Sequence, residues 1–154
     1  MDATTARKYS TRRRAIVGAI AEKLEQSLTG SAPFRSSVSN VSPRLRFWDE
    51  TTEFPSIQIG AGGETREYDG GGFRFRFLRV TVRCYVNDAT DVILALEELL
   101  EDVETVMEDY DPITYYDSTG TSQSTIQTTI LTVDTDEGVL EPLGVGEVVV
   151  EIRY

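Results

Sequence analysis

The sequence predicts an α+β domain with a mainly antiparallel β-sheet, helices packed on one face of the sheet, and long loops or arms. Apolar residues recur at helical spacing in segments 16–28 and 92–110. Apolar and polar residues alternate in segments 73–86 and 144–154, as they do in half-buried strands. In chain order we expect a helix, a long arm, a strand, a loop, a long strand, a helix, a loop and two strands. Such runs of strands with helices to one side are typical of α+β domains.

The composition indicates one domain over residues 1–154 and disfavours most enzymatic chemistry. The chain has 154 residues, 40% hydrophobic, with one cysteine and no histidine. Imidazole-based activation of a nucleophile and a thiolate zinc cluster are therefore excluded. We expect a structural or binding protein with no catalytic residues, no metal and no cofactor.

The charge is divided unevenly along the chain. Residues 1–50 hold nine Lys and Arg against five Asp and Glu, whereas residues 51–154 hold six against twenty-one. The net charge is +4 in the first part and -15 in the second, which gives -11 in total. Because binding to phosphates needs clustered cations, the acidic body is not expected to bind nucleic acid.

The first predicted helix follows an N-terminus, residues 1–10, that we expect to be flexible. Its apolar side is formed by Ile16, Ile20, Leu24 and Leu28, and Gly30 is placed to end it. The helix starts with Arg12, Arg13 and Arg14, where the helix dipole disfavours cations. The cluster is either a solvated helix start or a contact for an acidic partner. The apolar run is too short for a signal peptide or a membrane span.

A Ser-rich segment with two prolines, residues 29–53, is expected to be an extended arm or a long loop. A short strand through Ile57 and Ile59 follows, and then the glycine-rich sequence GAGGETREYDGGG. This sequence lacks the Gly-Lys-Ser/Thr ending of a phosphate loop, and Glu64, Glu67 and Asp69 would repel a phosphate. We interpret residues 60–72 as a mobile hairpin loop.

Four arginines lie in the next strand: Arg74, Arg76, Arg79 and Arg83. The parity of the apolar residues changes between Phe77 and Leu78, so we expect a β-bulge there, or two strands bent at that point. Either arrangement would place all four arginines on one polar face. The final strand carries Glu147 and Glu151, which could pair with them across the sheet. Alternatively, the four arginines could form an interface with the acidic helix of another subunit or with a partner.

The second predicted helix is strongly acidic. Its polar side carries eight carboxylates and no basic residue: Asp91, Glu97, Glu98, Glu101, Asp102, Glu104, Glu108 and Asp109. Like charges four residues apart destabilise an isolated helix. Glu97, Glu98 and Glu101 could face solvent, or they could contact a basic surface of another subunit or partner. The later Asp134 and Asp136 lack the remaining ligands of a calcium loop.

Taken together, five segments resemble the tail terminator, or tail-completion, proteins of long-tailed bacteriophages. They are the first helix, the long segment before FPSIQIG, the strand RFLRVTVRCYV, the helix ALEELLEDVETVM and the ending TILTVDTDEGVLEPLGVGEVVVEIRY. The resemblance covers residues 12–154. It implies a hexameric ring that caps the tail tube, ends polymerisation of tube and sheath, and offers a docking surface to the head connector. It implies no catalysis and no cofactor.

The same resemblance implies partners and a location. The partners are further copies of the chain, the tail tube protein, the head-completion or connector protein and, in a contractile tail, the sheath protein. The location is the head-tail joint of the virion, after assembly in the host cytoplasm, with no membrane contact. DNA would pass without tight binding, and Glu64, Glu67 and Asp69 would lie nearest its channel unless that loop faces another ring.

Two other functions remain open from the sequence. One is a different neck protein of the same virion. The other is a carboxylate-dependent, metal-assisted hydrolase, which would need convergent carboxylates in a cleft. A calorimetric titration with a divalent ion separates the hydrolase from a structural ring, because only the hydrolase predicts stoichiometric binding.

Overall fold

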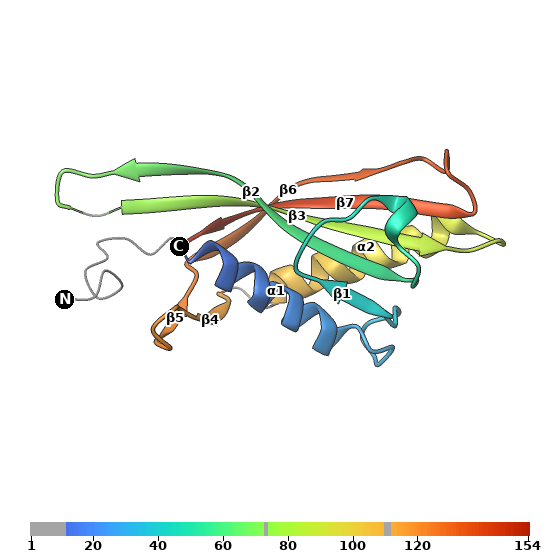
Figure 1. The fold of residues 1–154 in the computed structure, drawn as a ribbon, viewed down its shortest axis with the longest axis horizontal. Coiled ribbons are helices and arrows are strands. Elements are labelled where there is room, and N and C mark those ends of the chain that lie inside the picture. The colour runs from blue at the N-terminus through green and yellow to red at the C-terminus, as the bar shows by residue number, and fades with distance from the viewer. Residues whose placement is uncertain (1–11, 73, 110–111) are drawn as a thin grey trace.

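The computed structural model describes residues 12–72, 74–109 and 112–154, and the N-terminal segment 1–10 lies outside them. Within these residues the chain forms a five-stranded sheet in the order β1-β2-β3-β7-β6 (Figure 1). The strands are β1 (Asn40–Ser42), β2 (Ser56–Tyr68), β3 (Arg74–Asn87), β6 (Gln127–Thr135) and β7 (Leu143–Arg153). Only the short β1 is parallel to its neighbour. The predicted mainly antiparallel sheet is therefore confirmed.

Two helices, α1 (Arg13–Ser27) and α2 (Val92–Asp109), lie on the same face of this sheet, as Figure 1 shows. The segment between α2 and β6 contains a small two-stranded sheet of β4 (Thr114–Tyr116) and β5 (Ser122–Ser124). The sequence predicts only a polar loop there. The α+β class with helices on one face is confirmed.

The hydrophobic core lies between the sheet and the two helices. The buried apolar side chains are those that the two periodicities predict: Ile16, Ile20 and Leu24 of α1, Leu96, Leu99, Val103 and Val106 of α2, and Val148, Val150 and Ile152 of β7. From β3 the even-numbered Leu78, Val80, Val82, Cys84 and Val86 join them. Burying each large aliphatic side chain contributes about 1.5–3 kcal/mol.

The N-terminal turn of α2 approaches β7 closely at Gly144. A β-carbon at Gly144 would lie 2.7 Å from Cγ2 of Val92 and 2.9 Å from Cγ2 of Val86. Both neighbours are β-branched and have little rotamer freedom with which to move away. The glycine therefore sets the distance between helix and sheet at this end of the core.

Residues 29–53 form a long connection that lies along the body and contains β1 and a short 3₁₀ helix, η1 (Trp48–Glu50). Part of it crosses β2 on the sheet face opposite the helices. There the main-chain N–H of Arg46 donates to Oε1 of Gln58 at 2.5 Å, and the Gln58 amide donates to Thr51 at 2.9 Å. The polar side chain of Gln58 is buried because these bonds satisfy it.

The hairpin of β2 and β3 extends well beyond the helices, as Figure 1 shows on the left in green. Residues 65–68 of β2 and Arg74 of β3 are exposed on it. The expectation of a mobile loop over residues 60–72 is wrong for residues 60–68, which are part of β2. The two strands pair from Glu64 and Leu78 out to Tyr68 and Arg74.

Candidate functional site

The four arginines of β3 do not share one face. Strand β3 pairs with β7 in unbroken register from Phe77 opposite Arg153 to Asn87 opposite Leu143, so its side chains alternate without a shift. Arg74 and Arg76 therefore have the parity of the core residues, and Arg79 and Arg83 have the other parity. The predicted single row of arginines, and the predicted bulge near Phe77 and Leu78, are wrong.

The bulge lies in the neighbouring strand instead. The register of β2 against β3 shifts between Ala61 and Glu64, which face Val80 and Leu78. Gly62 and Gly63 thus stand opposite the single residue Arg79. Glycine is the residue that best tolerates such a bulge, so the Gly-Gly pair is the sequence signal for its position. The extra residue is accommodated in β2, and β3 stays regular.

The Phe side chains whose parity suggested a bulge are covered in another way. The Arg153 guanidinium carbon lies 4.4 Å from the ring centroid of Phe75 and 5.8 Å from that of Phe77. Arginine stacked on aromatic rings in this way stabilises by about 0.5–1 kcal/mol at an exposed site. An apolar row can therefore lie on the helix-free face without being part of the core.

Arg83 forms the cross-strand pair expected for this sheet. Its guanidinium donates to Oε1 of Glu147, at 2.7 Å from Nε and 2.7 Å from Nη2. The expected pairing with the last strand is confirmed for Glu147, whereas Glu151 stands opposite Arg79 in the register. Burial is the largest single effect on the pKa of Arg83 and lowers it. The hydrogen bond and charge of Glu147, with smaller effects of Tyr85, together outweigh burial and raise this pKa above its usual value.

This pair gives a testable prediction for stability. We expect Arg83→Glu to lower the free energy of unfolding by about 1 kcal/mol, because it places two carboxylates opposite each other on adjacent strands. Adding Glu147→Arg should restore most of the loss in chemical denaturation. The matched control is Arg83→Glu with Glu151→Arg, which should restore nothing, since Glu151 lies opposite Arg79. Equal recovery by both double variants would contradict the pairing.

At the base of the projecting hairpin, aromatic and charged side chains from distant segments meet. The Arg12 guanidinium carbon lies 5.4 Å from the ring centroid of Tyr154 and 6.0 Å from that of Tyr115. The Arg76 guanidinium lies 5.5 Å from the Tyr154 ring, and the Tyr154 hydroxyl donates to Glu64 at 2.5 Å. Burial first, and then the Glu64 carboxylate, raise the pKa of Tyr154 above its usual value.

The three acidic residues expected in a glycine-rich loop are distributed along the hairpin. Glu64 lies on β2 with its side chain only 6% exposed, and it accepts from Arg66 at 2.8 Å. Glu67 is exposed on the projecting part of β2. Asp69 lies in the turn, where its carboxylate accepts from the main-chain N–H of Gly71 at 2.6 Å. Their orientation toward a DNA channel stays a prediction, and Glu64 is already engaged within the chain.

Arg13 and Arg14 line a groove together with Arg44, a neighbour that the sequence does not predict. The groove has a volume of about 640 Å³ and lies between α1 and the edge of the sheet next to β1 and β2. Its lining is Arg13, Arg14, Val17 and Gly18 of α1, Pro43 and Arg44 after β1, and Ala61 of β2. We call it the basic groove. Arg13 donates to the carbonyl of Gly62, which fixes one wall, whereas Arg14 and Arg44 are exposed.

The polar side of α2 carries a regular row of glutamates. Glu97, Glu101, Glu104 and Glu108 follow one another at spacings of four, three and four residues, and so lie along one side of the helix. We call this row the acidic stripe. Burial first, and then the charges of Glu108, Glu101 and Glu97, raise the pKa of Glu104. Glu98 is half-buried beside this row.

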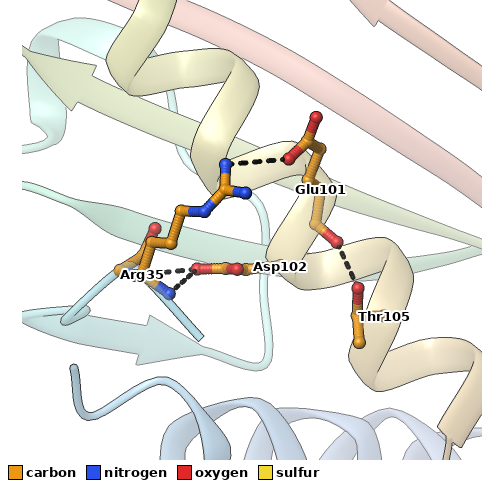
Figure 2. Close-up of polar contacts among 5 residues, drawn as sticks. Arg35, Glu101, Asp102 and Thr105 are labelled. Atoms are coloured by element: carbon orange, nitrogen blue, oxygen red, sulfur yellow. Dashed lines mark hydrogen bonds and ion pairs between the residues drawn. The ribbon is translucent and has the colours of Figure 1, made fainter. Parts of the chain in front are cut away.

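Two neighbouring acidic residues of α2 contact the connection that follows α1, as Figure 2 shows. The exposed Glu101 accepts from the guanidinium of Arg35 at 3.2 Å. Asp102 is buried, and its Oδ2 accepts from the main-chain N–H groups of Arg35 at 3.0 Å and Ser36 at 2.7 Å. Asp102 therefore holds residues 35 and 36 against α2 through hydrogen bonds. The prediction that Asp102 lies on the exposed acidic side of the helix is wrong, because its side chain is buried.

Among the described residues, no three acidic or cysteine side chains gather as they would around a metal ion. Neither described helix is both long and apolar enough to cross a membrane. The described surface carries opposite charges in two places: the basic groove beside α1 and the acidic stripe on α2.

Comparison with known proteins gives two matches. The profile of a family described as Bacteriophage Tail Tube Terminator Protein matches residues 10–154. The chain is also 31% identical, over 150 residues, to the tail tube terminator protein p142 of Escherichia phage T5. That alignment covers 92% of each chain.

Proposed function

Because the chain belongs to the family of bacteriophage tail tube terminator proteins, we propose that it closes into a homo-oligomeric ring, six-fold when assembled, on the end of the tail tube. The ring ends polymerisation of the tube by covering the surface to which the next ring of tube protein would add. It belongs to the tail end of the virion neck, and it forms in the host cytoplasm together with the tail.

The observation that carries this proposal is the separation of opposite charges on one subunit. The basic groove lies beside α1 and β2, and the acidic stripe lies on α2. Two complementary surfaces on different elements make a head-to-tail contact, and repetition of such a contact closes a ring when the rotation between copies allows it. A subunit that paired through a single self-complementary patch would give a closed dimer instead.

The projecting hairpin supports a second part of the proposal, which concerns neighbouring rings. It extends beyond the core, and we infer that it reaches the tail tube protein on one side or the head connector on the other. In a contractile tail the sheath protein would be a further partner. We further infer that DNA passes through the ring without tight binding, because a net charge of -11 repels phosphate over most of the surface.

The test of ring formation is native mass spectrometry of the full chain across a concentration series, with electron microscopy of tail tubes to which the chain has been added. We expect hexamers at high concentration, and rings on tube ends even where the free chain is monomeric, since binding to the tube favours assembly by mass action. Tubes that stay open at their ends and keep growing would overturn the proposal. A single copy on each tube end would overturn the ring.

A further inference from the structure

The basic groove and the acidic stripe carry opposite charges. We propose that the basic groove of one copy receives the acidic stripe of the next copy. This inference rests on the ring proposed above and names its subunit contact. The two surfaces lie on different elements, so the contact can repeat head-to-tail from copy to copy, which the proposed ring requires.

Gly18 is the first observation that points to an occupant of the groove. It lies in the interior of α1, where glycine is less stable than alanine because its backbone has more freedom to lose. Apart from its chain neighbours and the nearby backbone of α1, no heavy atom of the described residues would lie within 4 Å of a β-carbon at Gly18. The packing of the chain therefore does not require glycine there. A partner that approaches the helix backbone closely would require it.

Charge is the second observation, and it identifies the occupant as acidic. Three guanidinium groups, from Arg13, Arg14 and Arg44, surround an apolar floor that includes Val17 and Pro43. No Asp or Glu is among the residues that line the groove.

The chain itself carries a surface of the required sign. The four glutamates of the acidic stripe lie on one side of α2, three or four residues apart, and like charges at these spacings repel one another. Arg35 beside Glu101 is exposed and leaves the rest of the stripe open. Three arginines of a neighbouring copy would offset this repulsion. Duplex DNA is the less suitable occupant, because the remaining surface of this acidic chain would repel it.

The decisive experiment mixes two full-length variants with opposite charge reversals. One carries Arg14→Glu and Arg44→Glu, so its groove and stripe are both negative. The other carries Glu97→Arg, Glu104→Arg and Glu108→Arg, so both of its surfaces are positive. We expect each variant alone to assemble about 100-fold more weakly than the wild type, because like charges meet at every contact. An equimolar mixture should regain assembly, with the two variants alternating around the ring.

Native mass spectrometry reads this result directly, because the two variants differ in mass and alternation gives equal numbers of each. Glu25→Arg on α1 and Glu141→Arg before β7 are matched controls, since both residues are exposed and lie outside the two surfaces. Circular dichroism confirms that each variant is folded. Assembly of either charge-reversed variant at the wild-type level, or failure of the mixture to assemble, would overturn the contact while leaving ring formation by the wild type intact.

Gly18→Leu tests the groove without changing charge. We expect a higher melting temperature, because leucine favours the helix and meets no steric obstacle, together with assembly at least about tenfold weaker, because the side chain fills the groove. Gly18→Ala should show a smaller effect on assembly. Undiminished assembly of Gly18→Leu would contradict the proposal, as would duplex DNA binding that Arg14→Glu with Arg44→Glu abolishes. A wild type that forms no ring, free or on tubes, would refute the proposed function itself.

Discussion

Asp102→Ala is expected to lower the free energy of unfolding by about 3 kcal/mol, with a fall in melting temperature of about 8 °C. The substitution removes the acceptor of two main-chain N–H groups, those of Arg35 and Ser36, and the carboxylate that it removes is buried. Hydrogen bonds to a charged acceptor contribute about 1.5–3 kcal/mol each, and both of these bonds are partly shielded from water. Chemical denaturation of the purified chain measures the difference.

The neighbouring residue supplies the control for this prediction. Glu101→Ala removes an ion pair whose side chains are 61% and 62% exposed, and it should cost less than about 1 kcal/mol. Asp102→Asn keeps one acceptor oxygen and should fall between the two alanine variants. If Asp102→Ala and Glu101→Ala were equally stable, the two main-chain bonds would not be what fastens residues 35 and 36 to α2.

Gly144→Val is expected to destabilise the chain by about 3 kcal/mol. The new β-carbon alone would lie within 3 Å of methyl groups of Val92 and Val86, and the two further methyl groups of valine have less space still. The first turn of α2 must then move away from β7, which opens the core beside it. Thermal unfolding followed by circular dichroism measures the loss.

Gly70→Val is the matched control, because a β-carbon at Gly70 would meet nothing within 4 Å. We expect its effect to stay within about 0.5 kcal/mol. A Gly144→Val variant as stable as this control would mean that the helix and the sheet can separate at this end without cost. The close approach at Gly144 would then not be a constraint on the fold.

The helices and the last strand could be predicted from the sequence because each buries one side. Ile16, Ile20 and Leu24 recur at helical spacing, and every second residue of β7 from Val148 onward is buried. The alternation also placed Glu147 and Glu151 on the side of the last strand that faces the arginines, but only the register of the sheet shows that Glu147 lies opposite Arg83. The spacing of apolar residues is sufficient to predict the type of an element and its buried residues wherever the element buries a single side.

The position of the bulge could not be predicted from β3 alone. The apolar residues of β3 change from odd to even positions after Phe77. This pattern fits either a bulge in β3 or a regular strand whose phenylalanines are covered by other side chains on the helix-free face. Here Arg153 covers Phe75 and Phe77, and the shift lies in β2 at a pair of glycines. The cover comes from β7 and the bulge lies in β2, so neither can be predicted from the residues of β3.

The basic groove shows the same limit. Arg12 precedes α1 and has a left-handed backbone conformation, so its side chain does not follow the helical direction of Arg13 and Arg14. Arg12 lies over Tyr115 and Tyr154, whereas Arg13 and Arg14 line the groove. The third arginine of the groove, Arg44, comes from a connection about thirty residues later. Arg44 reaches the groove only because that connection packs against α1. No local sequence pattern predicts this packing.

The order of strands in the sheet also determines how the chain reaches its native state. Apart from the short β1, the sheet consists of two hairpins, β2 with β3 and β6 with β7. They meet along the seam between β3 and β7, where Arg83 and Glu147 are 64 residues apart in the chain. Hairpins form within microseconds, but pairing across the seam must first close a long loop. We therefore expect the seam to form more slowly than either hairpin, and until it closes, the edges of β3 and β7 can pair with another chain.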